Sequence, residues 1–209
     1  LVNAGVQLDS TVLAAYESWC TASVNDPDPG FWGHWPRYYA EMPVKQDWVQ
    51  AAAKRCQTAV VVIGRSAGED RENTLKKGSF YLTNKEKALL DAVTTAFQKV
   101  VLVLNIGSIM DFAEIDAYGD QISAILLVWQ LGMESGNAVA DVLTGQVNPS
   151  GRLTDTIAKT YADYPAQNFG NKAENRYTED IFVGYRYFET FAPERVLYPF
   201  GYGLSYTDF

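Results

Sequence analysis

Three stretches of the chain are almost continuously apolar and rich in β-branched residues, at 59–63, 100–105 and 123–129. Apolar residues at helical spacing run from Thr83 to about Gln98 and again from about Glu134 to Leu143. Strands that are buried on both faces show unbroken apolar runs, and strands that alternate with helices build parallel sheets. The pattern therefore predicts a three-layer α/β/α sandwich with a mostly parallel sheet.

The N-terminal part of the chain predicts helices without a strand before them. Asp9 and Ser10 can cap a helix from Thr11 to about Ala22, and a short helix over Trp48–Arg55 leads into the first strand. We therefore expect a flavodoxin-like sheet whose N-terminal βα unit is truncated, and a chain that is a fragment of a longer protein.

After Pro149 the pattern changes to short apolar stretches separated by polar loops, and we expect short strands at 151–156, 181–189 and 196–209. A length of 209 residues is enough to bury one sizeable core. We predict one α/β sandwich domain over 1–209. It consists of a partial N-terminal unit with an aromatic loop (1–57), core βα units (58–153) and C-terminal short strands and loops (154–209).

The charge balance excludes two classes of partner. The net charge is −8, whereas nucleic-acid and anionic-membrane surfaces need clustered Lys and Arg. No apolar run is long enough to span a bilayer. We therefore expect neither a nucleic-acid nor a membrane partner.

Cysteine and histidine usage narrows the chemistry further. Cys20 and Cys56 lie far apart without a C-x-x-C pattern, which argues against a zinc ribbon and favours buried free thiols. His34 is the single histidine and has no metal-ligating companion at a suitable spacing. We expect no metal and no cofactor.

The segment that follows the first strand offers two candidate chemistries. Ser66 lies in a Gly-x-Ser-x-Gly pattern, but a nucleophile elbow needs a following helix and a later histidine, and neither is present. Glu69 lies where the carboxyl end of a parallel strand opens toward a ligand cleft. From the residues alone, Glu69 is either a solvated loop carboxylate or a catalytic acid.

Five sequence blocks, in order, resemble the second domain of glycoside hydrolase family 3. They are "VVVIGRSAGEDREN", "KVVLVLNIGS", "ILLVWQLGMESGNAVADVLTGQVNPSGRL", "YTEDIFVGYRYFE" and "YPFGYGLSYT". The resemblance covers nearly the whole chain. It implies a retaining β-glycosidase of the β-glucosidase type, in which a (β/α)8 barrel supplies the aspartate nucleophile and this domain supplies the general acid/base.

The same resemblance implies roles for individual residues. The general acid/base position matches Glu69, with Glu72 as the alternative, and we expect Asp70 and Arg71 to pair and brace the loop. A retaining glycosidase holds its two carboxyl groups only about 5–5.5 Å apart.

Three further residues are expected near the substrate: Trp32, Trp35 and Ser66. The family places its nucleophile in a Ser-Asp-Trp-like block at the end of a barrel strand, whereas the Asp47–Trp48 stretch here is polar and helix-like. The barrel and its nucleophile are therefore expected to be absent from this chain, which would then be inactive alone. The partners implied are a β-glucoside or oligosaccharide and the barrel domain of the same protein, and a cytoplasmic location is favoured.

Two other classes of function remain open. The domain could be a non-catalytic interface or carbohydrate-binding module, or a flavodoxin-like ligand-binding domain. Loss of activity on changing Glu69 with folding retained would distinguish the enzyme from the first, and a bound chromophore or nucleotide would reveal the second.

Overall fold

The computed structural model describes residues 1–22, 36–67, 73–167, 173–174 and 176–207. The chain divides into two compact units. The first, here the sheet unit, comprises Leu1–Met110 and Glu114–Thr144, and the second, here the C-terminal unit, comprises Asp111–Ala113 and Gly145–Phe209.

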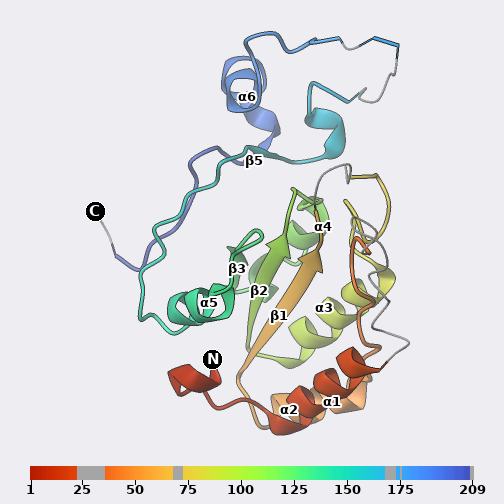
Figure 1. Cartoon of the computed structure of the whole chain (residues 1–209), viewed down its shortest axis with the longest axis vertical. Coiled ribbons are helices and arrows are strands. Elements are labelled where there is room, and N and C mark those ends of the chain that lie inside the picture. The colour runs from red at the N-terminus through yellow and green to blue at the C-terminus, as the bar shows by residue number, and fades with distance from the viewer. Residues whose placement is uncertain (23–35, 68–72, 168–172, 175, 208–209) are drawn as a thin grey trace. The chain divides into compact units, whose positions relative to one another are not determined.

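The sheet unit is built around three parallel strands in the order β1-β2-β3 (Figure 1). They are β1 (Thr58–Arg65), β2 (Lys99–Ile106) and β3 (Ala124–Leu127). Each strand overlaps one of the predicted apolar runs: β1 and β2 extend beyond theirs at both ends, and β3 lies within its run. Together with the surrounding helices, this sheet confirms the predicted α/β class.

Burial along the strands follows their position in this sheet. The central strand β2 buries consecutive residues, among them Leu102, Val103 and Leu104, because it is covered on both faces. The edge strand β1 alternates instead: Val61 and Ile63 are buried, whereas its even-numbered valines are exposed. All three carboxyl ends lie at one edge of the sheet, because the strands are parallel.

Helix α1 (Ser10–Thr21) begins where the sequence predicts. The Asp9 carboxylate accepts hydrogen bonds from the backbone N–H groups of Thr11 and Val12, at 2.9 and 3.1 Å. Asp9 also pairs with Arg55 at 2.6 Å, which ties the start of α1 to the chain just before β1. Helix α2 (Gln46–Ala53) starts two positions earlier than expected and buries Val49 and Ala52.

Helix α3 (Asn84–Ala96) contacts α2, β1 and β2 (Figure 1). Thr83 and Glu86 form a capping box at its start: the Thr83 side chain accepts from the N–H of Glu86, and the Glu86 carboxylate accepts from the N–H of Thr83. Its buried face includes Leu89, Leu90 and Val93, at helical spacing. This face closes the core on one side of the sheet.

Apart from the strands and helix of the C-terminal unit described below, the remaining regular elements of the described residues are short. Helix α4 spans Ala113–Asp116 and helix α5 spans Ser135–Leu143. Turns of 3₁₀ helix lie at Val2–Ala4, Gly119–Gln121, Tyr161–Asp163 and Pro193–Arg195.

The C-terminal unit pairs β4 (Ile157–Ala158) with β5 (Val196–Tyr198) in an antiparallel arrangement and contains helix α6 (Tyr185–Phe191). The strand predicted over 181–189 is wrong, because α6 begins inside that stretch. The one expected at 151–156 is also wrong, because β4 begins only at Ile157. Phe188 in α6 and Ala192, the residue that directly follows the helix, are both buried and four residues apart, a helical spacing that the aromatic residues of α6 disguise.

Both cysteines are free, but neither is buried, so the expected burial is wrong. Cys20 is exposed and Cys56 is partly exposed. The reason for Cys20 is that α1 lies at the surface and buries none of its residues. Within the described residues, no helix combines the length and apolar character needed to cross a membrane.

Candidate active site

Most of the residues singled out from the sequence lie outside the described part of the chain. The candidate acid/base Glu69, its alternative Glu72 and the pair Asp70 and Arg71 belong to the segment 68–72. Trp32, Trp35 and His34 belong to the segment 23–35. The structure describes Ser66 and the residues on either side of both segments, which we call stems.

The stem before 68–72 continues from β1. The backbone N–H of Ser66 donates to the carbonyl oxygen of Arg37 at 2.7 Å, and its hydroxyl group donates to the carbonyl oxygen of Pro36 at 2.5 Å. Pro36 directly follows the segment 23–35. The residues that directly follow the segment 23–35 and those that precede the segment 68–72 therefore meet at the carboxyl end of β1.

The stem after 68–72 is held by side-chain hydrogen bonds. The Asn73 amide donates to the carbonyl oxygen of Ile109 at 2.7 Å. The Ser79 hydroxyl group donates to the Asn73 amide oxygen at 3.2 Å and accepts from the N–H of Thr74 at 2.9 Å. Asn73 and Thr74 are thereby fixed to a turn and to the chain that follows β2.

A buried ion pair connects the end of β1, just before the segment 68–72, to helix α3. Arg65, the last residue of β1, contacts Glu86 in α3 through two nitrogens, at 2.6 and 2.8 Å. The side chains are only 4% and 5% exposed. The Tyr38 ring lies against the guanidinium group, 5.7 Å from its centroid. Sequence reasoning missed this pair, although an arginine that ends an apolar strand and a glutamate in a capping box are both visible signals.

The carboxyl ends of β2 and β3 reach the same place. The Asn105 amide donates to the carbonyl oxygen of Trp129 at 2.5 Å, and the Gln130 amide donates to the carbonyl oxygen of Arg65 at 3.4 Å. At Gly107 an added Cβ would lie 2.2 Å from the Cβ of Ala67, so only glycine fits. The residues after β2 and β3 thus pack against the end of β1 and the stem that precedes the segment 68–72.

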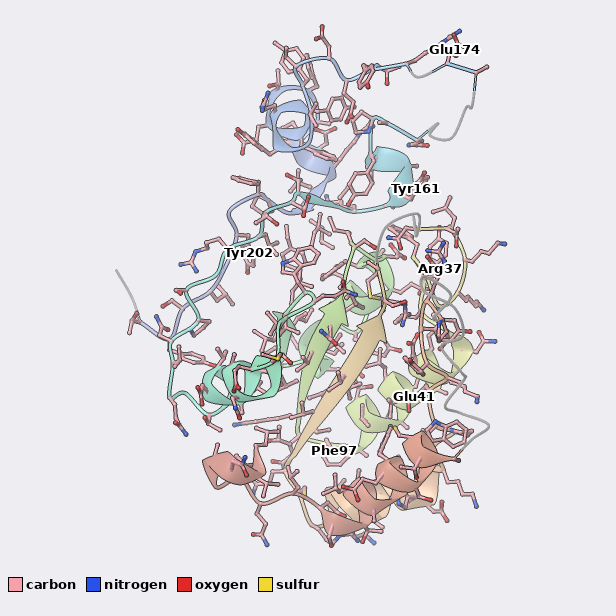
Figure 2. The ribbon with its side chains drawn as sticks, viewed as in Figure 1. Arg37, Glu41, Phe97, Tyr161, Glu174 and Tyr202 are labelled. Atoms are coloured by element: carbon pink, nitrogen blue, oxygen red, sulfur yellow. The ribbon has the colours of Figure 1, made fainter. Side chains whose placement is uncertain are left out.

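A cavity of about 380 Å³ opens beside this stem. Its lining combines α1, the segment 38–42 and the end of β1, and includes Tyr16, Trp19, Tyr38, Tyr39, Glu41, Met42, Arg65, Ser66, Glu86, Asn105 and Gln130. Figure 2 shows Arg37 and Glu41 on the same side of the sheet as α3. The lining thus combines aromatic rings with carboxyl and amide groups.

Glu41 is a partly buried carboxyl group at this cavity that no sequence pattern singled out. Its Oε1 atom accepts from the Tyr16 hydroxyl group and from the N–H of Met42, both at 2.8 Å. Burial raises the pKa of Glu41, and the Glu86 charge acts in the same direction, whereas the two hydrogen bonds and Lys85 oppose the shift. The arrangement anchors the chain that follows the segment 23–35.

The parallel sheet with its flanking helices makes this an α/β domain. Comparison with known proteins gives its family. Residues 9–206 match the family described as the glycosyl hydrolase family 3 C-terminal domain. The chain belongs to this family, as the resemblance of its sequence blocks implied.

Relatives within the family are longer enzymes. The chain is 47% identical over 210 residues to a β-glucosidase of Ruminococcus albus, a match that covers 100% of the chain and 22% of the relative. It is 36% identical to an exo-α-(1→6)-L-arabinopyranosidase of Bifidobacterium longum, over 80% of the chain and 22% of that relative. The chain thus spans less than a quarter of the length of these relatives.

Solved structures give the same picture. A β-glucosidase from Paenibacillus barengoltzii matches with a TM-score of 0.92 and 44% identity, over 97% of this chain and 22% of that one. β-Glucosidase 3B from Thermotoga neapolitana in complex with glucose matches with a TM-score of 0.83 and 36% identity, over 98% and 29%. The fold of this domain is therefore the fold found inside family 3 β-glucosidases.

Proposed function

We propose that this domain supplies the general acid/base of a retaining β-glucosidase, and that Glu69 is the residue. The observation that carries the proposal is the family membership combined with the position of Glu69, four residues beyond Arg65 at the carboxyl end of β1. The nucleophile comes from a (β/α)8 barrel in the same longer protein. The substrate is a terminal β-linked glucoside or oligosaccharide.

In the first step the Glu69 carboxylic acid donates its proton to the glycosidic oxygen while the barrel aspartate attacks the anomeric carbon. The leaving alcohol departs, and a covalent glycosyl-enzyme remains. In the second step the Glu69 carboxylate takes a proton from water, whose oxygen attacks the anomeric carbon and releases the sugar with its β configuration retained. The domain alone has no nucleophile for the first step and is expected to be inactive.

Neighbouring residues support this role. We expect Asp70 and Arg71 to pair with each other and brace the loop, which would leave the Glu69 carboxyl group without a cation beside it. Trp32 and Trp35 precede Pro36 in the sequence, and we expect their rings to stack on the sugar. The Ser66 hydroxyl group already donates to a carbonyl oxygen, so toward substrate it is an acceptor.

The test uses the full-length enzyme with Glu69→Ala and the matched variant Glu72→Ala. Removing a general acid/base lowers the rate by about 10²- to 10⁴-fold. Azide can replace the missing base in the second step, because it attacks the glycosyl-enzyme without giving up a proton. With a dinitrophenyl β-glucoside we expect that Glu69→Ala is slow, that azide restores turnover, and that a β-glycosyl azide forms.

Other results assign the site differently. Rescue by azide in Glu72→Ala alone would transfer the role to Glu72. Full activity of both variants would make the domain an interface or carbohydrate-binding module. A chromophore or nucleotide that copurifies with the protein would favour a flavodoxin-like ligand-binding domain.

A further inference from the structure

We infer that the buried Arg65–Glu86 pair positions the acid/base loop, by locking the two stems of the segment 68–72 to one another. The inference rests on the proposed function, because it concerns the loop that carries Glu69. Arg65 and Glu86 are positioning residues, and they act on the reaction through that loop.

Every donor of the Arg65 guanidinium group has a partner. Besides its two contacts with Glu86, the group donates to the carbonyl oxygens of Gly64 at 2.8 Å, Ser79 at 3.2 Å and Tyr81 at 3.4 Å. A guanidinium group has five N–H donors in a planar fork, so its orientation is fully determined here. Ser79 and Tyr81 belong to the turn that follows the loop, and the Ser79 hydroxyl group contacts Asn73 and Thr74, so the end of β1 is connected to the second stem through Ser79.

Glu86 extends the connection to α3. Its Oε2 atom accepts both from Arg65 and from the N–H of Thr83, at 2.8 and 2.7 Å. The carboxylate that caps the helix is therefore the carboxylate that holds the strand. A displacement of α3 relative to β1 would break the two contacts with Arg65, so the pair fixes the helix against the end of the strand.

The segment 36–42 completes this arrangement. The Tyr38 ring covers the Arg65 guanidinium group and fills the space beside Gly78, where an added Cβ would lie 2.1 Å from the ring. Pro36 and Arg37, on the same segment, accept the hydrogen bonds of Ser66. The segment 36–42, the end of β1 and the turn at 78–81 thus meet around the Arg65 side chain.

Stability alone does not explain a buried pair of this kind. Two charges removed from water lose hydration that their mutual attraction barely offsets, and apolar residues of similar volume often serve as well or better. What an apolar replacement lacks is direction, because dispersion contacts do not fix an orientation as a two-point fork does. The pair is therefore best explained by the geometry that it imposes on the loop.

This role predicts a selective defect. Protonation of the leaving oxygen depends on a carboxyl group held within hydrogen-bond reach, and a misplacement of about 1 Å can cost about 10²-fold in rate. A dinitrophenolate leaves without a proton, whereas a phenolate needs one. Loosening the loop should therefore slow phenyl β-glucoside far more than dinitrophenyl β-glucoside.

The experiment compares kcat/KM for these two substrates in the full-length enzyme, because this parameter reports the first chemical step. The variants are Glu86→Gln, Arg65→Lys and the apolar double variant Arg65→Met/Glu86→Leu, which remains informative if a single variant does not fold. Leu90→Ala, a fully buried change on the same helix, is the control for destabilisation alone. Glu69→Ala is measured in parallel.

We expect the double variant to retain a cooperative melt and to lose about 10- to 100-fold on phenyl β-glucoside but only about threefold on dinitrophenyl β-glucoside. Arg65→Lys keeps the charge without the fork and should show the same selectivity, and Leu90→Ala should lower Tm without it. Equal losses on both substrates, or none, would overturn the inference. If Glu69→Ala lacked the selective loss as well, the proposed function would fall with it. A selective loss in Glu69→Ala alone would overturn only the positioning role.

Discussion

The Tyr16 hydroxyl group donates a 2.8 Å hydrogen bond to the Glu41 carboxylate, which joins α1 to the chain that leads into α2. Burial is the largest cause of the raised pKa of Glu41, whereas the hydrogen bond from Tyr16 lowers it. Burial also raises the pKa of the Tyr16 hydroxyl group, and the Glu41 charge adds to that shift. Two residues from distant parts of the chain therefore control each other's proton binding.

This relationship predicts how stability depends on pH. An acid whose folded-state pKa is raised binds its proton more tightly in the folded state, so its contribution is complete below the ordinary value of 4.5 and is lost as pH rises through the folded-state pKa. Glu41→Gln should remove this loss and flatten the free energy of unfolding against pH. Tyr16→Phe should deepen it, because the hydrogen bond that lowers the pKa is gone. Urea unfolding between about pH 4 and pH 8 measures both slopes, and parallel curves for all three proteins would contradict the prediction.

Gly107 should be intolerant of a side chain. Its Cβ would lie 2.2 Å from the Cβ of Ala67 and 2.8 Å from the Gln130 side chain, so Gly107→Ala must displace the stem before the segment 68–72. We expect a loss of about 1–3 kcal/mol in the free energy of unfolding. Gly132→Ala is the control, since nothing lies within 4 Å of its added Cβ. Urea unfolding of both variants would refute the prediction if the two losses were the same.

Thr83 should matter as the cap of α3. Thr83→Ala removes the acceptor for the N–H of Glu86, 3.2 Å away, and should cost about 1 kcal/mol of stability. Thr83→Ser keeps the hydroxyl group and should retain most of it. Thr95→Ala, an exposed site in the same helix, should change stability by less than about 0.5 kcal/mol. A thermal melt compares the three variants, and a Thr83→Ala protein as stable as Thr95→Ala would contradict the role.

In the C-terminal unit, Phe188 should dominate the stability of α6. It is 1% exposed and packs with Ala158 and Ala192, with Tyr164 edge-on to its ring at 5.7 Å. Phe188→Ala should cost about 3–5 kcal/mol. Phe191→Ala, three residues further on, changes a ring that is 58% exposed and should cost much less. Hydrogen exchange of the α6 amides would detect the difference, and equal protection in both variants would argue against it.

The sequence was most informative where one signal dominated. The unbroken apolar runs located β1, β2 and β3, and Asp9 and Thr83 marked the starts of α1 and α3, because a cap is a local interaction. The helix α6 was missed because tyrosine and phenylalanine favour strands, and its single buried turn is too short to reveal a period. Local signals predicted local structure.

The candidate site was harder to predict for a different reason. The pairs Arg65–Glu86 and Tyr16–Glu41 join residues that come together only once the sheet and helices have packed, so no motif contains both partners. Glu69 was assigned through a family resemblance, which carries information about a barrel that composition and spacing in this chain cannot contain. Its role therefore stays a prediction until the azide experiment is done.

The two stems on either side of the segment 68–72 are each fixed by contacts that do not involve the residues between them. The chain-closure entropy of a longer segment between these fixed ends costs only about 0.6 kcal/mol for each doubling of its length. Such a scaffold can exchange or extend the loop without being refolded around it.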